Sequence, residues 1–407
     1  MNPLLDLLQP YPFQKLAELF KGVQPNPAYP AVSLHIGEPK HTTPQFICDA
    51  LAGNLNGLAN YPTTLGSDAL RNSIASWIQR RYQLGADSIN AKTPALDPKT
   101  QVVPVNGSRE ALFSFAQAVI DRSRANPVVI SPNPFYQIYE GAALLAGATP
   151  HFFNTVAEDN FALNFNQISD DIWQRTQLMY VCSPGNPNGH VMPLSEWKTL
   201  FEMSDRYGFV IAADECYSEI YFDNPPLGAL EAAQQLGRTD FRNLVIFSSL
   251  SKRSNVPGMR SGFVAGDAKV LEKFTLYRTY HGCAMNPAVQ AASIAAWNDE
   301  THVAENRRLY KEKFTRVVEI LKPVLPVVWP DASFYLWLQV PIADTNFAQA
   351  LHRDYNVTVL PGSFLAREVR GINPGANYVR IALVASLEET LDAARRIAEF
   401  TQKLNLN

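Results

Sequence analysis

A lysine set between hydroxyl groups is an unusual polar feature of this 407-residue sequence. The stretch SLSKRSNVPGMR, residues 249–260, follows the apolar run NLVIF and places Lys252 between Ser251 and Ser254, with Arg260 further on. A primary amine can form a covalent Schiff base with a carbonyl compound, and hydroxyls with a guanidinium can hold a phosphate. The stretch therefore indicates a covalent site for a carbonyl compound that carries an anionic group.

Polar residues of complementary chemistry follow three other apolar runs. They are Gly107, Ser108 and Arg109 in NGSREAL, Asn186 in PGNPNG, and Asp214 with Tyr217 in DECY. The segment NGSREAL opens a predicted helix, whose free N–H groups can bind an anion. Because ligands of open α/β sheets bind beyond the carboxyl ends of the strands, we expect these residues to meet.

Each of these features has an ordinary explanation when taken alone. NGSREAL is typical of a capped helix start, PGNPNG of a tight turn, and a lysine such as Lys252 is commonly solvated. Together they supply what a phosphate-bearing aldehyde cofactor requires: a lysine for the Schiff base, an anion site, and an acid, Asp214, for a ring nitrogen. The combination therefore favours a cofactor site.

Short β-rich runs between about residues 100 and 265 must position these side chains. They are QVVPV, PVVIS, TPHFF, LMYVCS, FVIAAD, NLVIFSS and SGFVAG. Several are apolar throughout, as strands covered on both faces are, and helix-like segments such as residues 108–122 and 194–207 separate many of them. This alternation predicts an α/β fold with a mostly parallel, doubly wound sheet.

The pattern changes after about residue 285. A long helical pattern is followed by FYLWLQV, VTVLPG, YVRIALV and a closing amphipathic helix from Leu387. A chain of this length exceeds what one hydrophobic core usually supports. We therefore predict a large cofactor-binding domain over residues 45–285 and a smaller α/β domain formed by residues 1–44 and 286–407.

Composition excludes several function classes. A net charge of −3 offers no general attraction to nucleic acid or to an anionic membrane. The N-terminus lacks the pattern of a secretory signal, and no apolar window is long enough to span a membrane, so we expect a cytoplasmic protein. The scattered Cys48, Cys182, Cys216 and Cys283 predict reduced, mostly buried thiols and no metal site.

In this order the motifs resemble those of the fold-type I, class I and II pyridoxal-phosphate aminotransferases. The resemblance runs from SLHIGEP at residues 33–39, through YPTTLGSDALR, SPGNPNG, DECY and SLSKRSNVPGMR, to YVRIAL at residues 378–383. It implies pyridoxal 5'-phosphate as cofactor, amino acid and 2-oxo acid substrates, and a homodimer with shared active sites. Asn188 departs from the NPTG motif of the family, but the functional Asn186 is retained.

The resemblance implies a role for each candidate residue. Lys252 would carry the cofactor and move the proton at the substrate α-carbon. Asp214 would keep the ring nitrogen protonated, so that the ring withdraws electrons, while Asn186 and Tyr217 would bind the phenolic oxygen. The phosphate would be held by Gly107, Ser108, Arg109, Ser249, Ser251 and Arg260. Tyr136 would stack on the ring, with its neighbour Phe135 as the alternative, and Tyr61 would reach the phosphate of the other subunit.

Arg380 is the only charged residue in the apolar run YVRIALV. A buried guanidinium requires an anionic partner, which an internal aspartate could supply. The resemblance instead implies that Arg380, with Asn186, binds the α-carboxylate of the substrate, and that Gly37 brings a backbone amide close to it.

The N-terminal segment MNPLLDLLQPYPFQKLAELFKG, with SPGNPNG and SLSKRSNVPGMRSG, most resembles bacterial N-succinyl-diaminopimelate aminotransferases of lysine biosynthesis, which use glutamate as donor. Such a pocket must accept a distal carboxylate. Arg253 and Arg278 are candidates for it by their place in the sequence, with a surface role as the alternative.

Other functions stay open at this point. The chain could be an aspartate, alanine or aromatic amino-acid aminotransferase, or a β C–S lyase that releases pyruvate and ammonia. A cofactor-binding regulator would need a DNA-binding module, for which the sequence before the fold offers no room.

Overall fold

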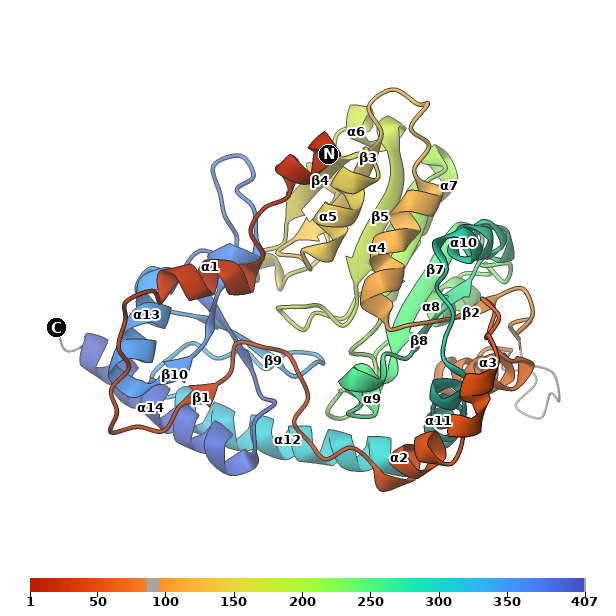
Figure 1. Ribbon diagram of the computed structural model, residues 1–407. Helices are drawn as coiled ribbons and strands as arrows, with labels where there is room; N and C mark the ends of the chain where they lie inside the picture. The colour runs from red at the N-terminus through yellow and green to blue at the C-terminus, as the bar shows by residue number, and fades with distance from the viewer. Residues whose placement is uncertain (86–94, 406–407) are drawn as a thin grey trace.

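The computed structural model describes residues 1–85 and 95–405, which form a large and a small α/β unit (Figure 1). The strands are β1 Val32–Ser33, β2 Val102–Val105, β3 Val128–Asn133, β4 Thr149–Asn154, β5 Thr176–Cys182, β6 Val210–Asp214, β7 Leu244–Ser249, β8 Gly262–Gly266, β9 Tyr335–Gln339, β10 Val357–Thr358, β11 Leu360–Pro361 and β12 Tyr378–Ala382.

The α-helices are α1 Pro12–Leu19, α2 Gln45–Ala52, α3 Asp68–Tyr82, α4 Ser108–Val119, α5 Ile138–Leu145, α6 Asp170–Arg175, α7 Leu194–Tyr207, α8 Ala229–Gln235, α9 Leu250–Arg253, α10 Ala268–His281, α11 Pro287–Asn298, α12 Thr301–Leu321, α13 Asp344–Tyr355 and α14 Leu387–Asn405. Each apolar run that the sequence analysis assigned to the large sheet forms one of its strands. The prediction of a mostly parallel α/β sheet is confirmed.

The large sheet has seven strands in the order β2-β8-β7-β6-β5-β3-β4. All neighbours are parallel except β8, which runs antiparallel to both β2 and β7. Cys182 at the end of β5 pairs with Asp214 at the end of β6. Ser249 and Val105 both pair with Gly262, so the carboxyl ends of β7 and β2 lie at the same edge. The strand ends that carry the candidate residues therefore converge.

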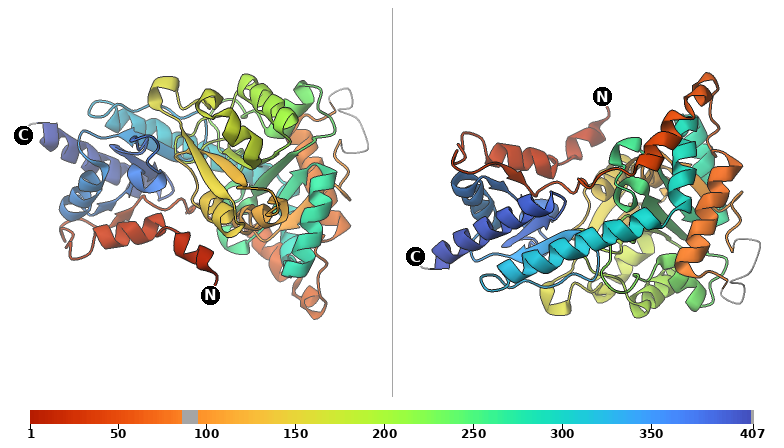
Figure 2. Two further views of the ribbon diagram at one scale, coloured as in Figure 1. Left: turned by 90° about the horizontal axis from the view of Figure 1, so that it is seen from above. Right: turned by 90° about the horizontal axis from the view of Figure 1, so that it is seen from below.

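Helices cover both faces of this sheet, as Figure 2 shows. The helices α4, α5 and α10 pack on one face, where Phe115, Tyr139 and Phe274 are buried. On the other face Trp77 of α3 and Trp197 of α7 are buried. Burial of apolar side chains on both faces is what the continuous apolar runs require.

The small unit contains a parallel pair, β1 and β10, and an antiparallel sheet in the order β11-β12-β9. The helix α14 packs along α12, and α1 packs against β11 (Figure 1). The long helical pattern after residue 285 forms two helices, α11 and α12. Because α11 packs against α2 and α3, with Trp297 in the core of the large unit, we place the boundary after Asn298 and not at residue 285.

Two further observations concern the chain as a whole. Within residues 1–85 and 95–405, no helix combines the length and the apolar character needed to cross a membrane. The four cysteines are free thiols, but the expectation that they are mostly buried is wrong, because Cys48 is exposed on α2 and the other three are half-buried.

Candidate active site

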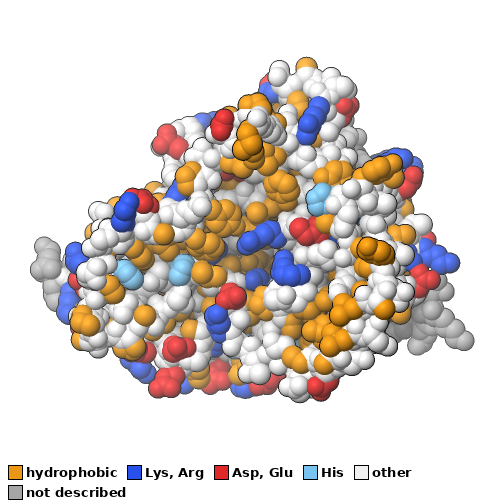
Figure 3. All heavy atoms as spheres, viewed as in Figure 1, with side chains coloured by type: hydrophobic (Ala, Val, Ile, Leu, Met, Phe, Trp, Pro, Cys, Tyr) orange, Lys and Arg blue, Asp and Glu red, His pale blue; other side chains and the backbone are white. Residues whose placement is uncertain are grey.

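A cavity of about 520 Å³ opens at the carboxyl edge of the large sheet and is also lined by residues of the small unit. Figure 3 shows a hollow near the centre of this face, in which lysine and arginine side chains gather. Its lining includes Gly37, Ser108, Arg109, Tyr136, Asn186, Asp214, Tyr217, Ser249, Ser251, Lys252, Arg260 and Arg380. The structure thus brings together nearly all the residues that the sequence singled out.

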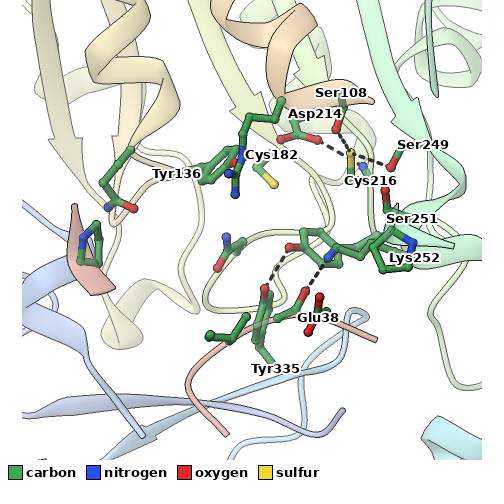
Figure 4. A pocket seen from close by; sticks show the side chains of 18 of the residues that line it. Glu38, Ser108, Tyr136, Cys182, Asp214, Cys216, Ser249, Ser251, Lys252 and Tyr335 are labelled. Carbon is green, nitrogen blue, oxygen red and sulfur yellow. Dashed lines mark hydrogen bonds between the residues drawn. The ribbon is translucent and has the colours of Figure 1, made fainter. Parts of the chain in front are cut away.

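Lys252 lies on the short helix α9, directly after β7, and points into the cavity (Figure 4). Its ammonium donates to the carbonyl of Gly37 and lies 5.5 Å from the centre of the Phe334 ring. Burial lowers the pKa of Lys252 to about 8, and the guanidiniums of Arg380 and Arg109 act in the same direction. A larger fraction of this amine than of an ordinary lysine is therefore neutral, and so nucleophilic, near neutral pH.

Asp214 ends β6 and is almost fully buried. Its carboxylate accepts hydrogen bonds from the hydroxyl of Tyr139 at 2.8 Å and from the N–H of Cys216 at 3.3 Å. Burial raises the pKa of this carboxyl because the charged form loses hydration. A protonated ring nitrogen would compensate for that loss, which makes Asp214 a suitable partner for a pyridinium.

The N-terminus of α4 forms a cradle for an anion. Gly107 has a φ of +84°, and a Cβ added there would lie 2.2 Å from the guanidinium of Arg260, so only glycine fits. The hydroxyl of Ser108 accepts from the thiol of Cys216 at 3.0 Å. The first N–H groups of α4 have no partner within the helix, and a guanidinium faces them across Gly107. This arrangement fits a phosphate.

Arg380 is held in place but not neutralised. Its guanidinium donates to Asn186 Oδ1 and to the carbonyl of His35, both at 2.8 Å, and lies 4.3 Å from the centre of the Tyr335 ring. It is 4% exposed, and no ion pair among the described residues includes it. The alternative of an internal aspartate is therefore wrong. No internal anion therefore compensates its charge among the described residues, and the guanidinium would suit the carboxylate of a ligand.

Aromatic residues shape the cavity wall. Phe135 is buried and stacks on Phe152 away from the cavity, whereas Tyr136 lines it and accepts a hydrogen bond from Arg109 Nε at 2.6 Å. Of the two neighbours, Tyr136 is thus the one in reach of a bound ring. Tyr61, by contrast, is fully exposed and does not line the cavity within this chain.

The hypothesis that Arg253 contacts the substrate is wrong. Its guanidinium is buried between the rings of Trp77 and Trp297 and donates to the carbonyl of Ala296 at 2.7 Å and to Glu300 at 2.6 Å. It caps the carbonyl end of α11 and so belongs to the core of the large unit.

Arg278 is also held by internal partners. Its side chain is fully buried on α10, it pairs with Glu110 at 2.9 Å, and it does not line the cavity. The suggestion that Arg278 binds the distal carboxylate of the substrate is therefore wrong as well.

Sequence reasoning missed several cavity residues. The hydroxyl of Tyr335 lies 3.0 Å from that of Tyr217 and its ring lies against Arg380, yet FYLWLQV reads only as a strand. Tyr139, near the start of α5, does not line the cavity but supports it, because its hydroxyl donates to Asp214. Tyr11 lines the cavity from the segment before α1, which no motif indicated.

A comparison with protein families decides the identity of the chain. The model named "Aminotransferase class I and II" matches residues 29–397. The chain belongs to this family. It is therefore a transaminase of the pyridoxal-phosphate-dependent kind, and the resemblance stated from its motifs is confirmed.

Several relatives and solved structures are similar to this aminotransferase over nearly their whole length. The LL-diaminopimelate aminotransferase of Moorella thermoacetica is 31% identical over 382 residues, covering 92% of this chain and 91% of the relative. An aminotransferase of Neisseria meningitidis is 53% identical with a TM-score of 0.93, covering 98% of this chain and 100% of that one. A probable N-succinyldiaminopimelate aminotransferase of Thermus thermophilus is 25% identical with a TM-score of 0.81, covering 95% and 99%.

The cavity residues of this aminotransferase fit pyridoxal 5'-phosphate. An amine of lowered pKa, a glycine-opened helix N-terminus beneath a guanidinium, and a buried carboxylate are present in one cavity. When bound, the cofactor supplies a reactive aldehyde and an electron-withdrawing ring. In such a site Lys252 would move a proton, and Arg380 would orient the carboxylate of the amino acid.

Proposed function

We propose that this aminotransferase transfers the amino group of glutamate to the oxo form of N-succinyl-L,L-2,6-diaminopimelate. The products are 2-oxoglutarate and N-succinyl-L,L-2,6-diaminopimelate. Both substrates carry a second carboxylate far from the reacting carbon. The proposal therefore requires a cation in the cavity besides those that hold the α-carboxylate and the phosphate.

The guanidinium of Arg109 is the observation that carries the proposal. Among the described residues this guanidinium donates one hydrogen bond, to the hydroxyl of Tyr136 at 2.6 Å, and takes part in no ion pair. We assign Arg260 to the phosphate and Arg380 to the α-carboxylate, so Arg109 is available for the distal carboxylate. The backbone N–H of Arg109 keeps the expected role at the phosphate, since it lies in the first turn of α4.

The carboxylates that line the cavity favour an acylated amine at the far end of the substrate. Asp214 is assigned to the cofactor, and Glu38 pairs with Lys40 at 2.6 Å, so it is already matched by a cation. A free distal ammonium, as in L,L-diaminopimelate, would need an unmatched acid, whereas a succinyl amide needs none. The similarity to the probable N-succinyldiaminopimelate aminotransferase of Thermus thermophilus supports this choice.

The unsuccinylated L,L-diaminopimelate is the second candidate, because the relatives from Moorella thermoacetica and Aquifex aeolicus bear the name LL-diaminopimelate aminotransferase. The test measures glutamate formed from 2-oxoglutarate with each of the two amino donors and with aspartate, alanine and an aromatic amino acid. Release of pyruvate from cystathionine is measured separately. We expect the highest kcat/KM with the succinylated compound. A higher value for L,L-diaminopimelate supports the second candidate, and a higher value for aspartate or alanine contradicts both.

We also propose a homodimer in which Tyr61 reaches the phosphate of the partner. The segment after Tyr61 lies against α10, where Thr64 and Thr279 are 3.3 Å apart, and the nearby Leu276 and Tyr280 are exposed. Exposed apolar side chains of this size favour a protein interface. Mixing inactive Lys252→Ala chains with Tyr61→Ala chains would restore some activity if sites are shared, because one site of the hybrid is then intact.

A further inference from the structure

Three polar side chains outside the cavity lining form a hydrogen-bonded chain, in which Asn306 and Lys313 are buried and His41 is half-buried. Lys313, on α12, is 3% exposed, and its ammonium donates to His41 Nε2 at 2.7 Å. His41 Nδ1 lies 2.7 Å from Asn306 Oδ1, and Asn306 Nδ2 donates to the carbonyl of Lys252 at 3.2 Å. The chain therefore ends on the backbone of the lysine that carries the cofactor.

The hydrogen-bond directions in this chain are fixed by what each group can do. The carbonyl of Lys252 only accepts, so the amide nitrogen of Asn306 faces it and the amide oxygen faces His41. Asn255 Nδ2 also donates to that oxygen, at 3.1 Å. His41 must then carry its proton on Nδ1 and accept from Lys313 on Nε2. Burial and the neighbouring Lys313 lower the pKa of His41 to about 4, which keeps this neutral form.

The other end of the chain reaches the strand that carries Arg380. The ammonium of Lys313 also donates to the carbonyls of Leu383 and Ala385, which follow β12. His41 itself follows the segment that contains Gly37. No ion pair among the described residues includes Lys313, so these neutral acceptors hold a buried charge. A buried ammonium without an anionic partner is stable only where several hydrogen-bond acceptors are held around it.

We propose that His41, Asn306 and Lys313 are positioning residues that fix the backbone of Lys252 relative to Arg380. Lys252 belongs to the large unit and Arg380 to the small one, yet both act on the same substrate molecule. Arg380 holds the carboxylate while Lys252 moves the proton at the adjacent carbon, so their separation decides the geometry of that transfer. A misplacement of about 1 Å in such a transfer costs roughly a hundredfold in rate.

Asn306→Asp is the sharpest test, because it keeps the size of the side chain and the acceptor for His41 but removes the donor to Lys252. His41→Leu breaks the chain at its centre, whereas His41→Gln keeps one donor and one acceptor. Tyr310→Phe is the matched control: its ring lies 4.5 Å from that of His41, and its hydroxyl has no partner among the described residues.

The measurement is the single-turnover rate with the best amino donor of the wild-type enzyme, unlabelled and deuterated at the α-carbon. We expect Asn306→Asp and His41→Leu to lower the saturating rate by about 10- to 100-fold and to raise the isotope effect, with KM changed less than threefold. We expect His41→Gln to recover most of the rate, and Tyr310→Phe to match the wild type.

The proposal is overturned if the isotope effect stays unchanged, or if the rates of all variants simply follow their melting temperatures. It is also overturned if KM rises while the saturating rate is kept. If His41→Leu does not fold, Asn306→Asp and His41→Gln still decide between these outcomes. Because the test uses whichever donor the wild-type enzyme accepts, it does not depend on the succinylated substrate.

Discussion

Replacing Arg380 by lysine separates charge from geometry at the carboxylate site. Both side chains are cationic, but only arginine presents two parallel N–H groups to a carboxylate. The guanidinium is oriented by Asn186 and by the carbonyl of His35, each at 2.8 Å. Loss of one charge-assisted hydrogen bond costs about 1.5 to 3 kcal/mol, which corresponds to a roughly 10- to 150-fold lower kcat/KM.

Most of this loss should appear in KM, because the carboxylate is bound alike in the ground state and in the transition state. The assay is steady-state transamination with glutamate, together with the affinity for pyridoxal phosphate, which should not change. Arg396→Lys serves as the control: Arg396 is also buried in the small unit, but it binds the backbone carbonyls of Pro30 and Tyr355. A kcat/KM for Arg380→Lys within threefold of that for Arg396→Lys would refute the assignment.

Three further predictions follow from the cavity. Asp214→Asn removes an attraction to the ring nitrogen worth about 4 kcal/mol, for a separation of about 4 Å and an effective dielectric of about 20. Stopped-flow rates of amino transfer should therefore fall at least about a hundredfold. A fall of less than about tenfold would contradict this role. Arg109→Gln should lower kcat/KM about tenfold or more for glutamate but not for alanine. Equal losses for both substrates would show that Arg109 does not bind the distal carboxylate. The neutral amine of Lys252 is the nucleophile that captures pyridoxal phosphate, and burial lowers its pKa to about 8. The rate of capture by the apoenzyme should therefore rise with pH and level off, with a midpoint near 8. A midpoint near the ordinary lysine pKa of 10.5 would contradict this effect of burial.

Patterns that depend on the neighbouring sequence were predictable. Apolar runs followed by Gly107, Asp214 and Lys252 indicated both the strands and the edge at which these residues meet, since parallel strands end together. The break between α11 and α12 was not predictable, because it depends on a distant residue. Arg253 binds the carbonyls of Ala296 and Asp299 and so ends α11 where the helical pattern continues.

Side chains that act through long-range packing were the least predictable. Arg253 lies next to the cofactor lysine in sequence, but α9 is helical, so neighbouring side chains point in different directions. It is therefore buried between Trp77 and Trp297, while Lys252 enters the cavity. Tyr335 and His41 reach the site or its support only through contacts between the two units, for which a single sequence carries no periodic signal.

The central claim is that Lys252 carries the cofactor. The direct measurement is mass spectrometry of peptides from the holoenzyme after borohydride reduction, which makes the bond between lysine and pyridoxal phosphate permanent. We expect the added mass on Lys252 in SLSKRSNVPGMR, and no added mass in the Lys252→Ala variant. Its appearance on another lysine of the wild-type enzyme, or its absence from a cofactor-loaded enzyme that is active, would contradict the account.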